Sequence, residues 1–216
     1  MELRELSLAV QKGSGKQSKQ LVKEALEQGL KPADILNNGL IAAMGEIGDK
    51  FKEGQIYVPE MLIAAKAMQA GLKVLAPSLK AEGVEPIGKA VIGTVKGDLH
   101  DIGKNLVIMM LESAGFEVID LGVDVPAEKF IQALQENPDV KIVGASALLT
   151  TTMPALKETV KALNEYPGRD KIKVMVGGAP ITQEFADEIG ADAYTEDAAS
   201  AAQVAKKLAT SVRVPA

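Results

Sequence analysis

The chain has 216 residues, 47% of them hydrophobic, which is enough to bury a core in one large domain or two small ones. Its 24 basic and 29 acidic side chains give a net charge of −5 with no compensating Lys/Arg cluster, which argues against a nucleic acid as partner. The absence of cysteine excludes disulfides, thiolate metal sites and cysteine nucleophiles.

The N-terminal segment and the hydropathy of the chain bear on its location. The charged segment Met1–Glu5 lacks the apolar core of a signal peptide. No stretch reaches the ~20 apolar residues that a membrane-spanning helix requires. We therefore expect a cytoplasmic chain that does not have a membrane as partner.

The first half of the chain has the apolar period of helices. Helices are predicted over residues 3–10, 14–28, 32–51 and 59–75. Ser14 is expected to cap the second helix and Gly29 to end it. Four helices on short connections predict a four-helix bundle as a first domain, residues 1–86, with the polar segment Lys80–Pro86 as linker.

The second half changes to short apolar runs separated by helical segments. Strands are predicted over residues 90–95, 117–121, 141–145, 173–176 and 191–194. Helices are predicted over residues 103–114, 127–136, 154–164, 182–189 and 197–208. This alternation predicts an α/β domain, residues 87–216, with a flavodoxin-like (Rossmann-like), doubly wound five-stranded parallel sheet.

Three unusual segments follow the first, third and fourth predicted strands. They are Lys96–Asn105, Ser146–Thr152 and Gly177–Pro180. In open parallel sheets, ligands bind beyond the carboxyl ends of the strands at the point where the strand order reverses. A strand order of 2-1-3-4-5 would make these three strands neighbours, so the three segments are expected to line one site.

His100 is the only histidine, which excludes zinc sites built on two histidines. Gly97 and Gly103 bracket it and are expected to let the backbone turn sharply and expose the imidazole. Asp98 is placed to accept a hydrogen bond from one ring nitrogen, which leaves the other for a metal already held by a macrocycle. The residues alone leave open the alternative that His100 caps a helix or lies in a polar loop.

The neighbouring residues also have two interpretations each. Ser146 and the run Thr150–Thr152 offer hydroxyls to a ligand or to the start of the next helix. Gly177–Gly178 either form a turn or admit a ligand to the backbone. Lys104 and Asn105 begin a helix where a polar or anionic group would fit, although we expect Lys104 to have a surface role.

The segments that follow the first, third and fourth predicted strands resemble motifs of a known family. Asp98–Gly103 resembles the Asp-x-His-x-x-Gly signature of cobalamin-binding domains, and Ser146–Leu148 and Gly177–Gly178 resemble its Ser-x-Leu and Gly-Gly elements. The resemblance implies that His100 replaces the dimethylbenzimidazole base as the lower cobalt ligand and is the metal ligand, while the freed base inserts beside the sheet, against Ser146. The cofactor-binding residues that it implies in this half are Asp98, His100, Asp101, Gly103, Ser146, Leu148, Thr150, Thr152, Gly177 and Gly178.

The helical half is similar to the cap domain of methionine synthase and of corrinoid methyltransferase proteins, in the segments Met44–Phe51 and Gly54–Leu62. Three residues match positions that cover the methyl-bearing face of the corrin and would also suit a bundle core: Phe51, Val58 and Met61. Thr152 departs from methionine synthase, which has serine at this position of its ligand triad.

The resemblance implies a corrinoid methyl carrier with cobalamin or a related corrinoid as cofactor. A substrate-specific methyltransferase would methylate Co(I). A second methyltransferase, using tetrahydrofolate or a thiol, would take the methyl group from methyl-Co(III), and a reductive activase would restore Co(I). The chain alone would not be catalytic, and the methyl donor stays open among methanol, methylamines, methoxylated aromatics and betaine.

Three alternatives belong to other functional classes. A cobalamin-binding sensor shares both domains but usually adds a basic DNA-binding segment. A mutase subunit shares the histidine motif but lacks this kind of helical cap. A helical bundle fused to a flavodoxin-like domain would bind no corrinoid.

Overall fold

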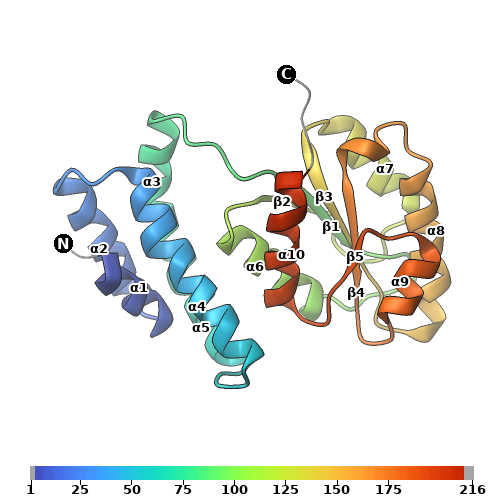
Figure 1. Cartoon of the computed structure of the whole chain (residues 1–216), viewed down its shortest axis with the longest axis horizontal. Helices are drawn as coiled ribbons and strands as arrows, with labels where there is room; N and C mark the ends of the chain where they lie inside the picture. The colour runs from blue at the N-terminus through green and yellow to red at the C-terminus, as the bar shows by residue number, and fades with distance from the viewer. Residues whose placement is uncertain (1–2, 212–216) are drawn as a thin grey trace. The chain divides into compact units, whose positions relative to one another are not determined.

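The computed structural model describes residues 3–211, so Met1 and Glu2, at the start of the charged N-terminal segment, lie outside the described residues. The chain divides into two compact units, of which the first contains residues 1–86 and the second contains most of residues 87–216. Figure 1 shows the helices and strands of both units. Within the described range, no helix is both long enough and apolar enough to cross a membrane.

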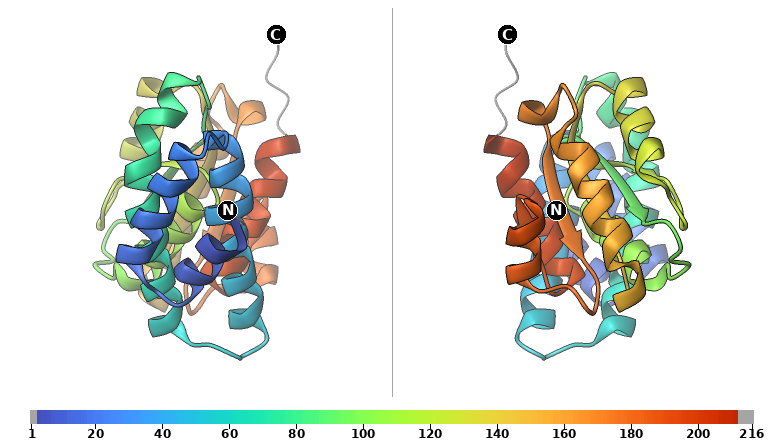
Figure 2. Two further views of the ribbon diagram at one scale, coloured as in Figure 1. Left: turned by 90° about the vertical axis from the view of Figure 1, so that its left-hand side faces the viewer. Right: turned by 90° about the vertical axis from the view of Figure 1, so that its right-hand side faces the viewer.

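The first unit is helical. Its elements are α1 (Leu3–Gln11), α2 (Gly15–Glu27), α3 (Pro32–Asp34), the π-helical η1 (Ile35–Ile41), α4 (Ala42–Lys52) and α5 (Val58–Ala81). Helices α3, η1 and α4 follow one another without a break, so the unit has four helical rods, as the apolar period predicts. Figure 2 (left) shows α1 and α2 in blue, and α2 packs along α5.

Three details of the helical half differ from the sequence-based expectations. Ser14 is the N-cap residue of α2, but its hydroxyl makes no capping hydrogen bond. The π-helical segment η1 has no periodic sequence signal. Helix α5 continues through Ala81, into the expected linker, because Leu79 is still buried and the left-handed Gly83 (φ +66°) follows only after that.

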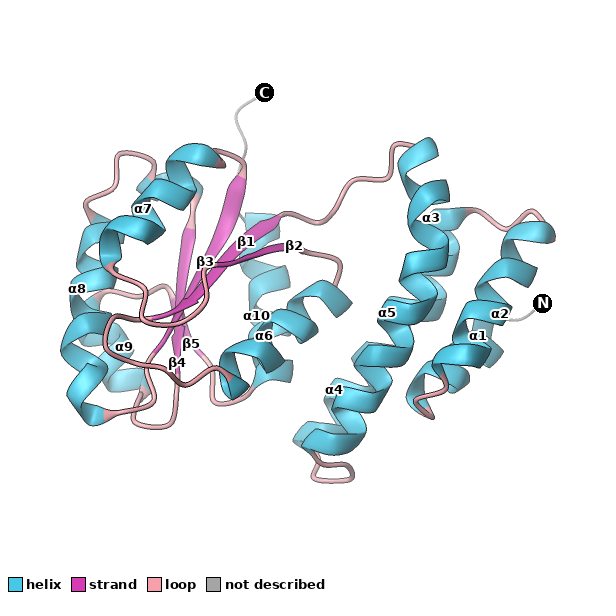
Figure 3. Ribbon diagram, turned by 180° about the vertical axis from the view of Figure 1, so that it is seen from behind, coloured by secondary structure: helices cyan, strands magenta, loops and turns pink. Residues whose placement is uncertain are grey.

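The second unit is built on a five-stranded sheet. Its strands are β1 (Lys89–Thr94), β2 (Glu117–Asp120), β3 (Val140–Ser146), β4 (Lys173–Gly177) and β5 (Ala193–Tyr194). All pairs are parallel and the order is β2-β1-β3-β4-β5, which confirms the predicted doubly wound topology. Figure 3 shows the strands in magenta between two layers of helices.

The helices of this unit cover both faces of the sheet. They are α6 (Ile102–Ser113), α7 (Ala127–Glu136), α8 (Met153–Asn164), α9 (Gln183–Ile189) and α10 (Ala198–Ser211), with short 3-10 turns η2 (Thr150–Thr152) and η3 (Arg169–Lys171). Helices α7, α8 and α9 cover one face, and α6 and α10 cover the other (Figures 1 and 3). On the first of these faces, Phe130, Leu156 and Ile189 pack against apolar residues of β1, β3 and β4.

Candidate functional site

The three predicted segments meet at the carboxyl edge of the sheet. Thr94 at the end of β1 pairs with Ser146 at the end of β3, and Ser146 pairs with Gly177 at the end of β4. Because the last residues of these strands are in register, the segments that follow them leave the sheet side by side. The structure therefore brings together the segments containing His100, Ser146 and Gly177.

Asp98 fixes the orientation of the His100 ring. The Asp98 side chain is fully buried, and its Oδ1 lies 2.7 Å from His100 Nδ1 and accepts the His100 backbone N–H at 3.1 Å. Since an ionised carboxylate can only accept, Nδ1 carries the ring proton. In the neutral imidazole this tautomer leaves the lone pair on Nε2, in a side chain that is 49% exposed, and Nε2 has no hydrogen bond within residues 3–211.

The second oxygen of Asp98 is held from β3. Asp98 Oδ2 accepts the Leu148 backbone N–H at 2.7 Å and the Thr152 hydroxyl at 2.8 Å. Burial alone would raise the pKa of Asp98, but the hydrogen bonds from Leu148, His100 and Thr152 outweigh it and hold the pKa well below its usual range. Asp98 is therefore a carboxylate in the folded protein, and Thr152, His100 and Asp98 form one hydrogen-bonded triad.

The Thr152 hydroxyl donates to Asp98 instead of capping the next helix. It occupies the N-cap position of α8 but makes no capping hydrogen bond. Its hydroxyl is buried and lies 2.8 Å from Asp98 Oδ2 and 2.9 Å from the Leu149 carbonyl. The charged acceptor is the stronger one, so the hydroxyl serves Asp98 rather than the helix.

Thr94 links Ser146 to the backbone of His100 and was missed in the sequence analysis. Its hydroxyl donates to the His100 carbonyl at 2.9 Å and lies 2.9 Å from Ser146 Oγ. Because Thr94 has one proton and gives it to His100, Ser146 donates to Thr94. A threonine at the end of an otherwise apolar strand is the signal that could have identified it.

The glycines of the site have different local roles. Gly97 has a left-handed backbone (φ +81°), as a sharp turn requires. Gly103 lies in the first turn of α6, where a helix is predicted, and has no positive φ, so of these two glycines only Gly97 makes the sharp turn. A Cβ added at Gly103 would meet no protein atom within 4 Å, so there is open space beside the His100 segment.

The two glycines of the Gly177–Gly178 pair also have different roles. At Gly178 the backbone has φ +124° and an added Cβ would collide with the Ala147 carbonyl oxygen, so the turn itself requires this glycine. At Gly177 an added Cβ would make only an ordinary contact with the Thr195 carbonyl. The fold therefore requires glycine at position 178, whereas at position 177 it would also accommodate a side chain.

Large apolar side chains are exposed around His100. Leu99 is 72% exposed, Ile102 77%, and Leu148 and Leu149 41% each. Only Leu148 was among the predicted site residues, although apolar residues in a loop expected to be polar are a usable signal. An apolar ligand surface would cover these side chains and gain the free energy of burying them.

The remaining predicted residues are in part exposed. Asp101 and Thr150 are exposed, and Asp101 accepts hydrogen bonds from the side chain and backbone of Asn105. In the helical unit, Met61 is buried while Phe51 and Val58 are half-buried. The role of these three as a cover for the corrin stays a prediction.

Lys104 contradicts its expected surface role. Its side chain is only 2% exposed, and its Nζ donates to both oxygens of Asp120 at 2.7 and 2.9 Å and to Asn105 Oδ1 at 2.7 Å. The general preference of lysine for the surface fails here because Asp120, at the end of β2, supplies an opposite charge. Nothing local to residues 100–105 reveals that partner.

The donor set of the site fits a macrocycle-held metal. Residues 3–211 contain no group of three His, Asp or Glu side chains placed to hold a metal ion. The half-exposed ring of His100 suits a single bond from Nε2 to a metal, the exposed leucines and Ile102 suit an apolar ring, and the space at Gly103 suits a close approach.

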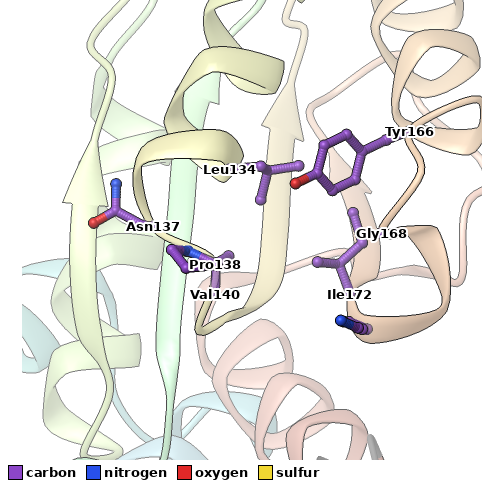
Figure 4. A pocket seen from close by; sticks show the side chains of 8 residues that line it. Leu134, Asn137, Pro138, Val140, Tyr166, Gly168 and Ile172 are labelled. Carbon is purple, nitrogen blue, oxygen red and sulfur yellow. The ribbon is translucent and has the colours of Figure 1, made fainter.

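A pocket in the same unit lies at the other edge of the sheet. It is lined by Leu134, Asn137, Pro138, Val140, Tyr166, Gly168, Lys171 and Ile172 (Figure 4). These residues lie before or at the beginning of β3 and β4. The pocket is therefore separate from the His100 site, which lies at the carboxyl edge of the sheet.

Comparison with known proteins agrees with the geometry. Residues 88–203 match the model of a B12 binding domain, and residues 2–76 match a second B12 binding domain model. Dimethylamine corrinoid protein 1 of Methanosarcina mazei is 48% identical over 86% of each chain, and the trimethylamine corrinoid protein of Methanosarcina barkeri is 43% identical over 84% of each.

Among solved structures, the methanol:cobalamin methyltransferase complex MtaBC of Methanosarcina barkeri aligns with a TM-score of 0.82 and 31% identity, over 96% of this chain and 79% of that one. These matches overturn the alternative without a corrinoid and give no support to the sensor. Family models cover most of the chain and relatives exceed 40% identity. The chain therefore belongs to the family of corrinoid proteins of methyltransferase systems, built from two B12-binding domains.

Proposed function

We propose that the protein is a methyl carrier that accepts a methyl group from a substrate-specific methyltransferase and passes it to a second one. The observation that carries the proposal is the half-exposed ring of His100, whose Nδ1 lies 2.7 Å from buried Asp98 and whose Nε2 is left for a metal. The bound corrinoid supplies the cobalt that receives and releases the methyl group.

The residues of the carboxyl edge have distinct tasks in this proposal. His100 is the protein ligand of the metal, and Asp98 with Thr152 holds its ring in one orientation. Leu99, Ile102, Leu148 and Leu149 are exposed and would lie against the bound corrin, where they would exclude water. Asp101, Gly103 and Thr150 border the ring, and Ser146, Gly177 and Gly178 border the nucleotide tail beside the sheet.

The domain assignment completes the proposal. Residues 1–86 form the helical cap, and Phe51, Val58 and Met61 cover the methyl-bearing side of the corrin. Residues 87–216 hold the cofactor. A cytoplasmic location belongs to the proposal, because a metal centre that must be reduced repeatedly requires a reducing compartment.

Partners follow from the same scheme. A substrate-specific methyltransferase, a second methyltransferase with tetrahydrofolate or a thiol as acceptor, and a reductive activase would each meet the chain. The names of the relatives, dimethylamine, trimethylamine and methanol proteins, make methylated amines and methanol the donors to test first.

The single histidine gives a direct test of the ligand. Apo-protein labelled with 15N-histidine is loaded with hydroxocobalamin and reduced to the Co(II) form for electron paramagnetic resonance. We expect the nitrogen splitting of the axial ligand to change from a triplet in unlabelled protein to a doublet in labelled protein, since His100 is the sole source of the label.

The His100→Ala variant serves as the control and should lose the doublet and most of the methyl uptake. Methyl uptake from the donor is then followed with a methyltransferase partner. A triplet that persists in labelled wild-type protein would show that another base binds the cobalt and would overturn the assignment of His100.

A further inference from the structure

Two carboxylates from one segment hold the His100 segment on both sides. Asp124, in the connection between β2 and α7, accepts the Gly97 backbone N–H at 2.7 Å through Oδ1, and its own N–H donates to the Asp98 carbonyl at 2.9 Å. Asp120, at the end of β2, holds Lys104 in the first turn of α6. One anchor lies before His100 in the chain and the other lies after it.

The Lys104–Asp120 contact is unusual because the lysine is buried. Its side chain is 2% exposed, while Asp120 is 44% exposed, so the ammonium has been withdrawn from water to meet the carboxylate. Burying an ammonium ion is unfavourable, and a buried ion pair adds little net stability compared with apolar packing. Asp120 is itself held by the Gly122 backbone N–H at 2.8 Å. Such a pair fits a positioning role better than a stabilising one.

The backbone of Asp124 is in an unfavourable conformation. Asp124 is the one non-glycine residue with a positive φ (+54°) among residues 3–211. A left-handed backbone at a non-glycine residue persists only where its surroundings hold it. The parallel bridge between Val95 and Val125 places the two segments next to each other at this point.

These contacts form a chain that ends at the metal ligand. Asp124 holds the Asp98 backbone, the Asp98 carboxylate holds the His100 ring, and Lys104 fixes the helix that leaves the loop. We infer that Asp124 and the Lys104–Asp120 pair are positioning residues that set how well His100 Nε2 meets the cobalt. The inference rests on the proposed function, in which His100 is the ligand.

At both Asp124 and Lys104, a disruptive substitution can be paired with a conservative one. Asp124→Gly keeps the left-handed backbone without strain but removes the carboxylate, and Asp124→Asn retains an acceptor for Gly97. Lys104→Met removes the charge at similar volume, and Lys104→Arg retains it. Lys157→Met breaks the exposed Lys157–Glu188 pair (2.6 Å) of the same unit and is the control for loss of an ion pair elsewhere.

The first measurement uses apo-protein and the single histidine. Long-range 1H–15N correlation spectra of 15N-histidine-labelled protein report the tautomer of His100, and we expect Nδ1–H in the wild type and in Lys157→Met. In Asp124→Gly and Lys104→Met, a loosened Asp98 contact should admit the Nε2–H tautomer. Asp124→Asn and Lys104→Arg should restore most of the wild-type spectrum.

The second measurement uses the loaded protein. Loss of either anchor should weaken hydroxocobalamin binding roughly tenfold, as for other residues that orient a metal ligand, and should reduce the fraction of Co(II) protein with the 15N doublet. If Asp124→Gly and Lys104→Met lower the melting temperature but leave the tautomer and the doublet fraction as in the wild type, both anchors only stabilise the fold and the inference is wrong. A wild type without the doublet would instead overturn the part of the proposed function that makes His100 the ligand, while the tautomers would still report on the anchors.

Discussion

The Thr152 hydroxyl lies 2.8 Å from Asp98 Oδ2, while His100 Nδ1 lies 2.7 Å from Oδ1 of the same carboxylate. A residue of the β3–α8 connection thus acts on the His100 ring through a fully buried charge. Removing the hydroxyl should therefore affect both the stability of the apo-protein and the orientation of the ring.

Thr152→Val tests this relationship, because it replaces the hydroxyl with a methyl group of similar size. We expect a loss of about 1–3 kcal/mol in the free energy of unfolding, since a charged acceptor loses a buried donor. Thr152→Ser keeps the donor and should lose about 1 kcal/mol or less. Urea unfolding of the apo-proteins measures both, and equal losses in the two variants would contradict a role for the hydrogen bond.

Asp98→Asn should change the pH dependence of stability. The pKa of Asp98 is lowered in the folded protein, so its ionised form contributes stability above the unfolded pKa of about 3.9, and this contribution is lost as the pH falls below that value. The variant should be less stable than the wild type at pH 7, and the difference between them should shrink from about pH 5 downward. Unfolding of apo-protein across pH 2–7 measures the difference, and a difference that is independent of pH would contradict the assignment.

Gly103→Ala should affect folding and cofactor binding in opposite directions. The backbone is helical and the space at Cβ is open, so the apo-protein should gain about 0.5 kcal/mol of stability. If the corrin occupies that space, hydroxocobalamin binding should weaken roughly tenfold, which corresponds to about 1.4 kcal/mol of steric cost. Unchanged binding, measured by absorbance titration, would show that the ring lies elsewhere.

Ile102→Ser tests the apolar surface around His100. The side chain is 77% exposed, so its removal should change apo-protein stability by less than about 0.5 kcal/mol. Corrinoid affinity should fall by about 1.5–3 kcal/mol if the ring buries this side chain. Leu8→Ser, at a side chain of α1 that is 40% exposed, is the control for loss of an exposed apolar group in the helical unit.

The sequence predicts the topology of the sheet well, because apolar runs alternate with helical segments and the carboxyl ends of parallel strands share one edge. It also predicts the contact of Asp98 with His100, since the two residues are two positions apart in a glycine-containing turn. The corrinoid family is confirmed by the comparisons. The binding role of each site residue stays a prediction.

The features that the sequence does not predict include contacts between residues that are distant in the chain. The sequence predicts a surface position for Lys104, because its partner Asp120 lies at the end of β2, 16 residues further along the chain. The sequence does not identify Asp124, because its contacts are with backbone atoms of Gly97 and Asp98. The π-helical turn of η1 has no periodic signature at all. The first two cases depend on tertiary contacts, which the periodicity of a sequence does not encode.

The half-exposed ring of the only imidazole makes the empty protein chemically distinguishable from the loaded one. Diethyl pyrocarbonate acylates an unprotonated, accessible imidazole nitrogen, and here that nitrogen is the one expected to bind the metal. The ultraviolet absorbance of the acylated histidine would therefore count the cofactor-free fraction of a preparation directly. It would do so without any partner enzyme and without reference to the colour of the corrinoid.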